Sequence, residues 1–350
     1  MSRAPLQFRL TSVVPVAAVA LILAACSDTA TAPTSKVTPQ AASDSRSPEL
    51  NNEHGHMFRT REWFANNDAK TGFAGRTGSG IFYHGGPVLQ QLTNVVAVYW
   101  ASGAAIFVNG PVAPSTGAGS ADASLVGFFL RNIGGSPYFN INSTYTDGSG
   151  RHILNNVNYT RFWANSANAP SGTTSVSDAQ MIAMLQSGFN SGALTYDAST
   201  LYAIFTAGKV NLGGGFGTQY CAYHTHGTVT VGGVAKTVLY AAMPYNYAYP
   251  SACTSGFVPA NGSAQVGGDP GADYEVNTLV HETEETTTDM MGTAWYDNRG
   301  YENADKCAWT WGATHTNGAG GTTNVSLGGK DFLIQQNWVN SGSGGCALKF

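Results

Sequence analysis

The segment DYEVNTLVHETEETTTD, residues 273–289, predicts a helix with an apolar side in its first half and a dense run of polar residues in its second. Asp273 is the expected N-cap, because Pro270 interrupts helical structure just before it. The threonines at 286–288 have low helix propensity, so the pattern weakens toward the end of the segment. The apolar side chains expected to face the core are Val276, Leu279 and Val280.

Three residues in the polar half form a candidate metal site. His281 and Glu285 are four residues apart, so both can point at one ion while Glu282 projects beside them. In His-Glu-x-x-His sites, two histidines at this spacing hold zinc and the glutamate between them takes a proton from water. Glu285 stands where the second histidine would be, and zinc also accepts carboxylate oxygens. The pattern predicts a Zn²⁺ site on a zincin-like helix, with Glu282 as general base.

Asp305 and Glu302 are the candidates for a third ligand, because a turn at residues 298–300 can return them to the helix. The surrounding sequence favours a cation, since no Lys or Arg occurs from residue 237 to residue 298. Arg299 is an alternative source of positive charge for the same cluster. The acidic residues in this stretch are Asp269, Asp273, Glu275, Glu282, Glu284, Glu285, Asp289 and Asp297.

Two other interpretations of the helix stay open. Glu282, Glu284, Glu285 and Asp289 could form a solvated face, with His281 at the surface or near a helix end. A calcium site is a further alternative, because carboxylates suit Ca²⁺, although the imidazole of His281 does not.

The segment Cys221-Ala-Tyr-His224-Thr-His226 could also hold zinc through its thiolate and imidazoles. A disulfide at Cys221 would exclude that site, leaving both histidines to pack or to line a cleft opposite the acidic helix. The four cysteines after residue 26 are an even number in a chain with an export signal, so two disulfides are expected. Among three possible connectivities, Cys221 with Cys253 and Cys307 with Cys346 are favoured.

The periodicity elsewhere predicts an α+β fold: a mixed β-sheet covered by helices, with Gly-rich loops and two disulfides. Short β-branched and aromatic runs predict buried strands at 94–100, 201–206 and 238–244. Weaker strand signals occur at 138–145, 153–159 and 228–231, the last followed by a Gly232-Gly233 turn. Apolar spacing predicts helices over 121–133 and 177–189.

Residues 1–25 have the pattern of an export signal, with Arg3 and Arg9 followed by an apolar run too short to span a bilayer. The ending Leu-Ala-Ala-Cys26 resembles the lipobox of bacterial lipoproteins, in which this cysteine carries the lipid. An ordinary export signal or a lone membrane anchor are the alternatives. We expect an exported protein, anchored in the cell envelope only through its lipid.

Residues 26–75 are rich in Ser, Thr and Pro and predict a disordered tether, in which His54 and His56 are expected to be solvated. Residues 76–350 are expected to form one globular domain. Only 11% of residues are charged and the net charge is −4, which gives no indication of nucleic-acid binding.

Several segments together resemble the EXORDIUM / phosphate-induced protein 1 family. They are YHGGPVLQQLTNVVAVYW at 83–100, YCAYHTHG at 220–227, YENADKCAWTWG at 301–312 and KDFLIQQNWVNSGSGGC at 330–346. Plant members of that family are secreted, apoplastic proteins linked to growth responses, with no established enzymatic activity. Bacterial relatives have His-Glu-x-x-Glu followed by Thr-Asp, which His281, Glu282, Glu285, Thr288 and Asp289 reproduce. The resemblance implies a metal-bearing branch of a zincin-like lineage.

Two functions from different classes follow. The first is a lipid-anchored, zinc-dependent hydrolase, peptidase-like, that acts on a peptide or on a cell-wall or other extracellular substrate. The second is a non-catalytic surface protein that binds a glycan or a protein partner, in which any metal serves stability.

Overall fold

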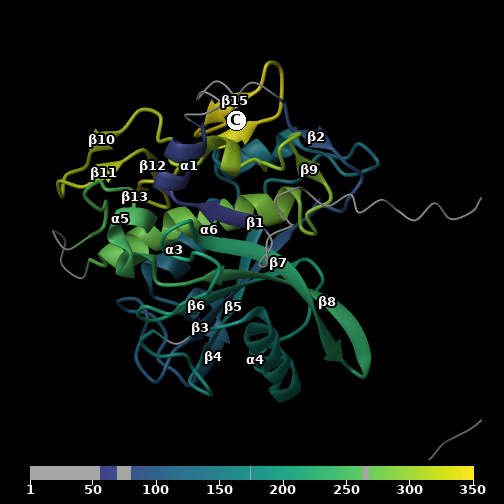
Figure 1. Ribbon diagram of the computed structural model, residues 1–350, viewed down its shortest axis with the longest axis vertical. Coiled ribbons are helices and arrows are strands. Elements are labelled where there is room, and N and C mark those ends of the chain that lie inside the picture. Colours follow the sequence, from purple (N-terminus) through teal and green to yellow (C-terminus); the bar gives the residue numbers. More distant parts are fainter. Residues whose placement is uncertain (1–55, 69–79, 174, 263–267) are drawn as a thin grey trace, which may run out of the picture. The chain divides into compact units, whose positions relative to one another are not determined.

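The computed structural model describes residues 56–68, 80–173, 175–262 and 268–350 (Figure 1). The predicted signal, Cys26 and residues 27–55 of the predicted tether lie outside the described residues. The folded part begins before residue 76, because β1 (His56–Arg59) and α1 (Arg61–Asp68) belong to it. The tether prediction was therefore wrong for residues 56–68. Met57 and Phe58 are buried, and β1 pairs with β7 (Tyr220–Val231), a long-range pairing that residues 56–59 alone do not indicate.

The centre of the fold is a seven-stranded mixed sheet with the order β1-β7-β8-β6-β3-β5-β4. Strands β8, β6, β3 and β5 run parallel, whereas β1, β7 and β4 each pair antiparallel with their neighbours. The three strong strand predictions are confirmed by β3, β6 and β8. Besides β1 and β7, the bounds of the strands in this sheet are β3 (Thr93–Trp100), β4 (Ser115–Ala118), β5 (Val157–Asn165), β6 (Thr200–Thr206) and β8 (Val234–Met243).

The weaker strand predictions fared less well. Residues 138–145 contain a 3-10 helix, η3 (Phe139–Thr144), in which the hydroxyls of Ser143 and Thr144 donate to backbone carbonyls three residues earlier. The strand expected at 153–159 begins only at residue 157, and the one at 228–231 is the end of the longer β7. The predicted turn is present, with both glycines at positive φ (59° and 78°).

Helices cover both faces of the sheet, as predicted. Val95, Ala97 and Tyr99 of β3 pack in one core with α3 (Leu125–Ile133) and α6 (Pro270–Thr288). Val96, Val98 and Trp100 point the other way, into a second core with α4 (Asp178–Ser191). A Ser177–Gln180 capping box starts α4, close to the predicted position. The fold is therefore mixed α+β with a sheet between helical layers.

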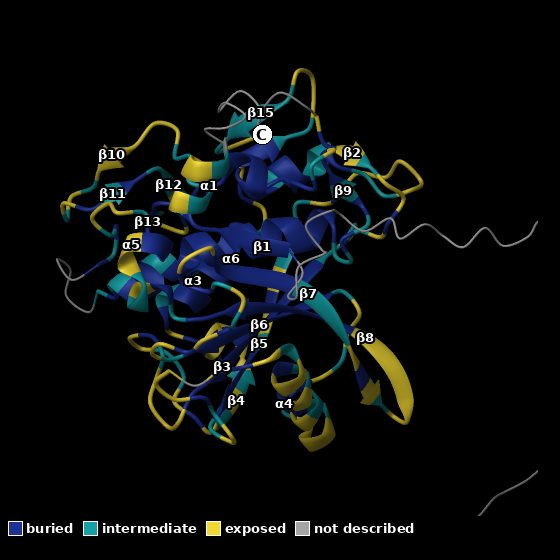
Figure 2. Ribbon diagram, in the orientation of Figure 1, coloured by how far each residue is buried: buried dark blue, intermediate teal, exposed yellow. Residues whose placement is uncertain are grey.

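The C-terminal segment lies on the side of α6 that is turned away from the sheet, so α6 is enclosed from both sides (Figures 1 and 2). The remaining elements are short. They are β2 (Phe82–Tyr83), η2 (Gly119–Ala121), η4 (Asn246–Ala248), α5 (Pro250–Cys253), β9 (Trp295–Tyr296), η5 (Asp305–Cys307), β10 (His315–Thr316), β11 (Thr322–Thr323), β12 (Val325–Leu327), β13 (Lys330–Phe332), β14 (Asn337–Val339) and β15 (Gly345–Ala347).

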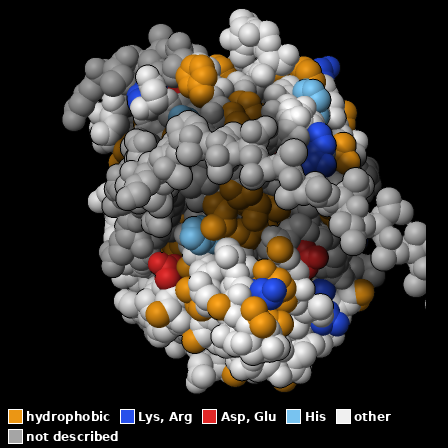
Figure 3. Space-filling view, turned by 90° about the vertical axis from the view of Figure 1, so that its right-hand side faces the viewer, with side chains coloured by type: hydrophobic (Ala, Val, Ile, Leu, Met, Phe, Trp, Pro, Cys, Tyr) orange, Lys and Arg blue, Asp and Glu red, His pale blue; other side chains and the backbone are white. Residues whose placement is uncertain are grey.

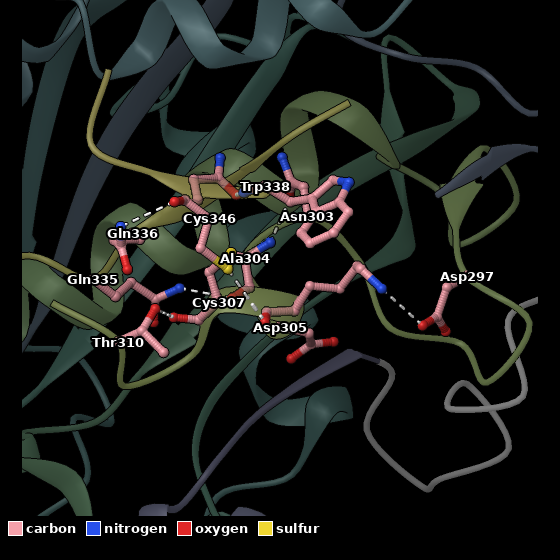
Figure 4. Close-up of a disulfide and its surroundings, with 12 residues drawn as sticks. Asp297, Asn303, Ala304, Asp305, Cys307, Thr310, Gln335, Gln336, Trp338 and Cys346 are labelled. Atoms are coloured by element: carbon pink, nitrogen blue, oxygen red, sulfur yellow. Dashed lines mark hydrogen bonds and ion pairs between the residues drawn. A yellow bond between two sulfur atoms is a disulfide. The ribbon is translucent and has the colours of Figure 1, made fainter. Parts of the chain in front are cut away.

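Two disulfides connect elements of the fold, with the predicted pairing. Cys221–Cys253 joins β7 to α5, and Cys307–Cys346 joins η5 to β15 (Figure 4). The first bond excludes the thiolate of Cys221 as a zinc ligand. Within the described residues, every helix is too short or too polar to cross a membrane.

Candidate metal centre

The helix that carries the predicted site starts earlier than the sequence indicated. Asp269, and not Asp273, is the N-cap of α6, and its side chain accepts a hydrogen bond from Ala272 N at 3.1 Å. Pro270 occupies the first turn, where its missing N–H costs nothing, so it starts the helix instead of breaking it. Asp273 instead accepts hydrogen bonds from the backbone and side chain of Asn261.

The threonine-rich half of α6 is helical to Thr288 and buried. The hydroxyls of Thr283 and Thr287 donate to carbonyls four residues earlier, at 2.7 Å each, which satisfies polar groups that are shielded from water. His281, Glu282, Glu284 and Glu285 are each 0% exposed. The interpretation of this half as a solvated face was therefore wrong.

The side chains of His281, Glu285 and Asp305 lie close together and form a group that could hold a metal ion. His281 Nε2 lies 3.0 Å from Glu285 Oε1 and 3.5 Å from Asp305 Oδ1. Ligand atoms at the corners of a tetrahedral zinc site, about 2.0–2.1 Å from the metal, lie about 3.3 Å apart. Both distances from His281 Nε2 are close to this spacing, and one ligand atom from each of the three residues lies within 4.8 Å of the other two.

The loop before η5 delivers Asp305. Its backbone N–H donates to Glu285 Oε1 at 3.0 Å, and its Oδ2 accepts from Glu302 N at 3.4 Å, which leaves Oδ1 directed at His281. The predicted turn is present, with Gly300 at φ 91°. Of the two candidates for third ligand, Asp305 lies in the His281 group and Glu302 does not.

Gln335 orients the imidazole of His281. Its Nε2 donates to Ala304 O at 2.8 Å, so its Oε1 faces His281 Nδ1 at 3.3 Å (Figure 4 shows Gln335 beside Ala304). A carbonyl oxygen at this position accepts the Nδ1 proton, which leaves the lone pair on Nε2. Metal-bound histidines are held in this way in many proteins.

A second group lies beside the first and contains a residue that the sequence analysis placed in solvent. His56 of β1 and His224 of β7 are direct partners in the sheet, and both are 1% exposed. Glu302 Oε2 lies 2.5 Å from His56 Nδ1 and 3.7 Å from His224 Nε2. The only sequence signal for burial of His56 is a short strand-like stretch in a polar tract. In a strand, His56 and Phe58 would point to the same face and Met57 to the other.

Glu282 lies between the two groups and forms a third group of possible metal ligands with His224 and Glu285. Its Oε2 is 3.2 Å from His224 Nδ1, which also lies 3.5 Å from Glu285 Oε2. Its Oε1 is buried and makes no hydrogen bond. His224 thus holds one carboxylate oxygen of Glu282, and the other oxygen is available to accept a proton.

Burial and charge perturb the protonation of these side chains. Burial raises the pKa of Glu282 to about 7, and burial with the charge of Glu285 raises that of Asp305 to about 6. Burial lowers the pKa of His224, but Glu282 and Glu285 outweigh this effect and raise it to about 9. Burial likewise opposes protonation of His281, whose pKa nevertheless rises through Glu285 and Asp305. Without a cation, the imidazoles of His224 and His281 would take up protons to offset the carboxylates, whereas burial and the charge of His224 lower the pKa of His56.

Lys and Arg side chains do not supply the positive charge that would balance these carboxylates. Arg299, considered above as a neutralising residue, instead pairs with Asp297, as does Lys306 Nζ at 3.2 Å. In the part of the chain that the structure describes, no Lys or Arg pairs with Glu282, Glu285, Asp289 or Asp305. Buried acceptor and ring atoms without hydrogen bonds include His281 Nε2, Glu285 Oε2, Asp305 Oδ1 and Asp289 Oδ2. Such atoms are costly to bury unless something binds them, and a divalent cation fits this donor set.

No protein-family model, curated protein or solved structure matches this chain. Membership of the EXORDIUM / phosphate-induced protein 1 family therefore stays a prediction from the motifs.

Proposed function

We propose that this protein is a zinc-dependent hydrolase, peptidase-like, in which His281, Glu285 and Asp305 hold the metal and Glu282 is the general base. The observation that carries the proposal is the convergence of His281 Nε2, Glu285 Oε1 and Asp305 Oδ1 at 3.0–3.5 Å around the imidazole. The hydrogen bond from His281 Nδ1 to Gln335 supports it, because it directs the Nε2 lone pair toward the two carboxylates.

The donor set favours zinc over calcium. One imidazole and two carboxylates match the nitrogen and oxygen ligands of catalytic zinc sites. Calcium takes six to eight oxygen ligands, and an imidazole at the centre of the group is a poor substitute for one of them. The backbone N–H of Asp305, which donates to Glu285 Oε1, holds one of these ligands in place.

Zinc would supply Lewis acidity and lower the pKa of water at the site. The protein's own part is proton transfer: Glu282 Oε1, free of hydrogen bonds, takes the proton of the attacking water and passes it to the leaving group. His224 holds the other oxygen of Glu282 through Nδ1, which limits the rotation of the carboxylate. Enclosure of α6 by the sheet and the C-terminal loops keeps bulk water away and strengthens each of these interactions.

The substrate class follows from the expected location. The two disulfides are compatible with the oxidising compartment that the export signal predicts. On the face that includes β2, β7, β8 and β9, hydrophobic side chains gather in a hollow with a histidine at its edge (Figure 3). A peptide or another extracellular substrate with apolar groups suits such a surface, and anchoring through lipidated Cys26 would hold the enzyme in the cell envelope.

Complete burial of the ligands favours a second candidate. His281, Glu282 and Glu285 are 0% exposed and Asp305 is 1% exposed, as expected for a metal that serves stability. In that case the protein is a non-catalytic surface protein that binds a glycan or protein partner.

Metal analysis of His281→Ala tests the metal centre. Purified wild-type protein is expected to contain zinc, and the variant is expected to lose the zinc held by the His281 group, because two carboxylates without the imidazole bind it weakly. His315→Ala, which removes an exposed histidine, is the matched control. Unchanged zinc in His281→Ala would refute this site. Zinc without hydrolysis across a broad peptide library would favour the non-catalytic candidate.

Gln335→Met is expected to weaken zinc binding at this site by about 10- to 100-fold, the usual effect of losing a residue that orients a metal-bound histidine. Methionine keeps the length of the side chain but cannot accept the Nδ1 proton of His281. Gln336→Met is the control, because Gln336 bonds Cys346 O instead. Competition with a chromophoric chelator measures the affinity, and equal values for the two variants would contradict the role of Gln335.

A further inference from the structure

The proposed function uses only Nδ1 of His224 and leaves His56 and Nε2 of His224 without a role. The two residues face each other across antiparallel β1 and β7, and their rings stack with centroids 5.0 Å apart and an angle of 9°. Phe58, two residues after His56, contacts the ring of His281 on α6, which places this side of β1 against the helix. Both imidazoles are therefore fixed inside the molecule, on the same side as the first metal group.

Three of the four ring nitrogens of this pair make no hydrogen bond, although His56 Nδ1 lies 2.5 Å from Glu302 Oε2. His56 Nδ1 and Nε2 and His224 Nε2 are all buried without a hydrogen bond. The Nδ1 of His224 lies within hydrogen-bond distance of Glu282 Oε2, and donation there leaves the lone pair on Nε2. His56 Nδ1 and His224 Nε2 thus both face the carboxylate of Glu302.

Glu302 supplies the oxygen of this group. Its Oε2 is 2.5 Å from His56 Nδ1 and 3.7 Å from His224 Nε2, a range that spans the spacing of about 3.3 Å between ligands of a tetrahedral zinc site. The loop that carries Glu302 also carries Asp305, and the two residues are joined by the hydrogen bond from Glu302 N to Asp305 Oδ2. One short loop can therefore supply a ligand to each of two ions.

Protonated histidines are the competing explanation for this arrangement. Two imidazolium rings stacked 5.0 Å apart would repel each other in a buried site, and the contact between His224 Nε2 and Glu302 at 3.7 Å is too long for a hydrogen bond. A single divalent cation held by two neutral imidazoles and one carboxylate avoids both problems. It would also offset charge from the nearby carboxylates.

We propose that His56, His224 and Glu302 bind a second first-row divalent metal ion, so that the protein has a two-metal centre with the carboxylate of Glu285 between the ions. Glu285 Oε1 faces His281, while its Oε2 lies 3.5 Å from His224, on the side of the second group. Two imidazoles and one carboxylate are a donor set found in zinc enzymes. Two adjacent ions can stabilise the attacking and the leaving oxygen of a hydrolytic reaction.

Zinc titration of the metal-stripped full chain tests the second site, with bound zinc measured after equilibrium dialysis. The wild type is expected to bind two equivalents, whereas His56→Ala and His281→Ala are each expected to bind one and the double variant none. Glu302→Gln, which keeps the shape of the side chain, is a second test in case His56→Ala does not fold. It is expected to lower the affinity for one of the two zinc ions by at least tenfold. His315→Ala is the control, and circular dichroism checks the fold of every variant.

The outcomes separate the two sites. One equivalent that is lost in His281→Ala and kept in His56→Ala overturns the second site and leaves the first. One equivalent that is lost in His56→Ala and kept in His281→Ala overturns the first, and with it the proposed function. A single equivalent lost in both variants means one shared ion and overturns the two-metal centre, and an absence of bound zinc overturns both sites.

Discussion

Glu282→Gln is expected to lower the turnover of hydrolysis by about 10²- to 10⁴-fold, the usual contribution of a general base. The amide has the shape of the carboxylate but cannot take a proton from water. Because His281, Glu285 and Asp305 are untouched, zinc content is expected to equal that of the wild type. The measurement is kcat on the best substrate of a peptide library, together with metal analysis of the same samples.

Glu284→Gln is the matched control for this experiment. Glu284 is a buried glutamate of the same helix, but its Oε2 accepts a hydrogen bond from Asn337 Nδ2 and it belongs to neither metal group. Burial raises the pKa of Glu284 well above its usual range, which favours the neutral form that glutamine resembles. Unchanged turnover in Glu282→Gln would exclude the general-base role, and loss of zinc would make Glu282 a ligand.

The parts of the site that sequence predicts are those set by local geometry. His281 and Glu285 are brought together by the pitch of a single helix, so their spacing in the chain is sufficient. Strands β3, β6 and β8 are continuous apolar runs because both of their faces are covered, and such runs are visible without any knowledge of their partners.

The parts that sequence does not predict depend on long-range pairing. His56 reaches the site only because β1 pairs in register with β7, more than 160 residues away. The choice between Asp305 and Glu302 depends on the path of one loop, in which Asp305 Oδ2 is held by Glu302 N. Loop conformations of this kind are set by hydrogen bonds that are not periodic, so no pattern in the residues distinguishes the two carboxylates.

The burial of the acidic half of α6 is a third such case. Four glutamate and histidine side chains in five residues are typical of a solvated surface, yet each is 0% exposed. The C-terminal segment covers them and supplies partners such as Asn337 for Glu284 and Gln335 for His281. Burying so many polar side chains costs free energy unless groups outside the helix bind them. For His281, Glu285 and Asp305 we expect the binding group to be a metal ion.

Chelation is therefore expected to destabilise the protein strongly, and more at pH 8 than at pH 6. A metal present at 100 times its Kd contributes about 2.7 kcal/mol. For a domain of this size, such a loss corresponds to a decrease in Tm on the order of 5–10 °C. The measurement is Tm with and without EDTA at both pH values under non-reducing conditions, with zinc added back as the control.

The sign of the pH effect comes from the metal-free protein. Folded-state pKa values of about 7 for Glu282 and Asp289 and about 6 for Asp305 exceed their unfolded values of 4.5, 3.8 and 3.8. The folded state therefore holds these protons more tightly, and the metal-free protein loses stability as pH rises from about 4 through 7.

His224 and His281 act in the same direction, whereas His56, whose pKa is lowered well below its usual value by burial and by the charge of His224, acts in the opposite one. The pKa of His224 rises from 6.5 to about 9, so its stabilising contribution is complete below 6.5 and is lost as pH rises toward 9. The pKa of Glu285 falls to about 2, so its contribution to the stability of the folded state is complete above pH 4.5 and is lost only in acid. It therefore does not alter the comparison between pH 6 and pH 8. Metal binding requires deprotonated ligands and strengthens with pH. The stability of the metal-bound protein thus rises over the pH range in which that of the metal-free protein falls. An equal or larger effect of EDTA at pH 6 would contradict this pH dependence. No effect of EDTA at either pH would show that these side chains offset one another by proton exchange and need no metal.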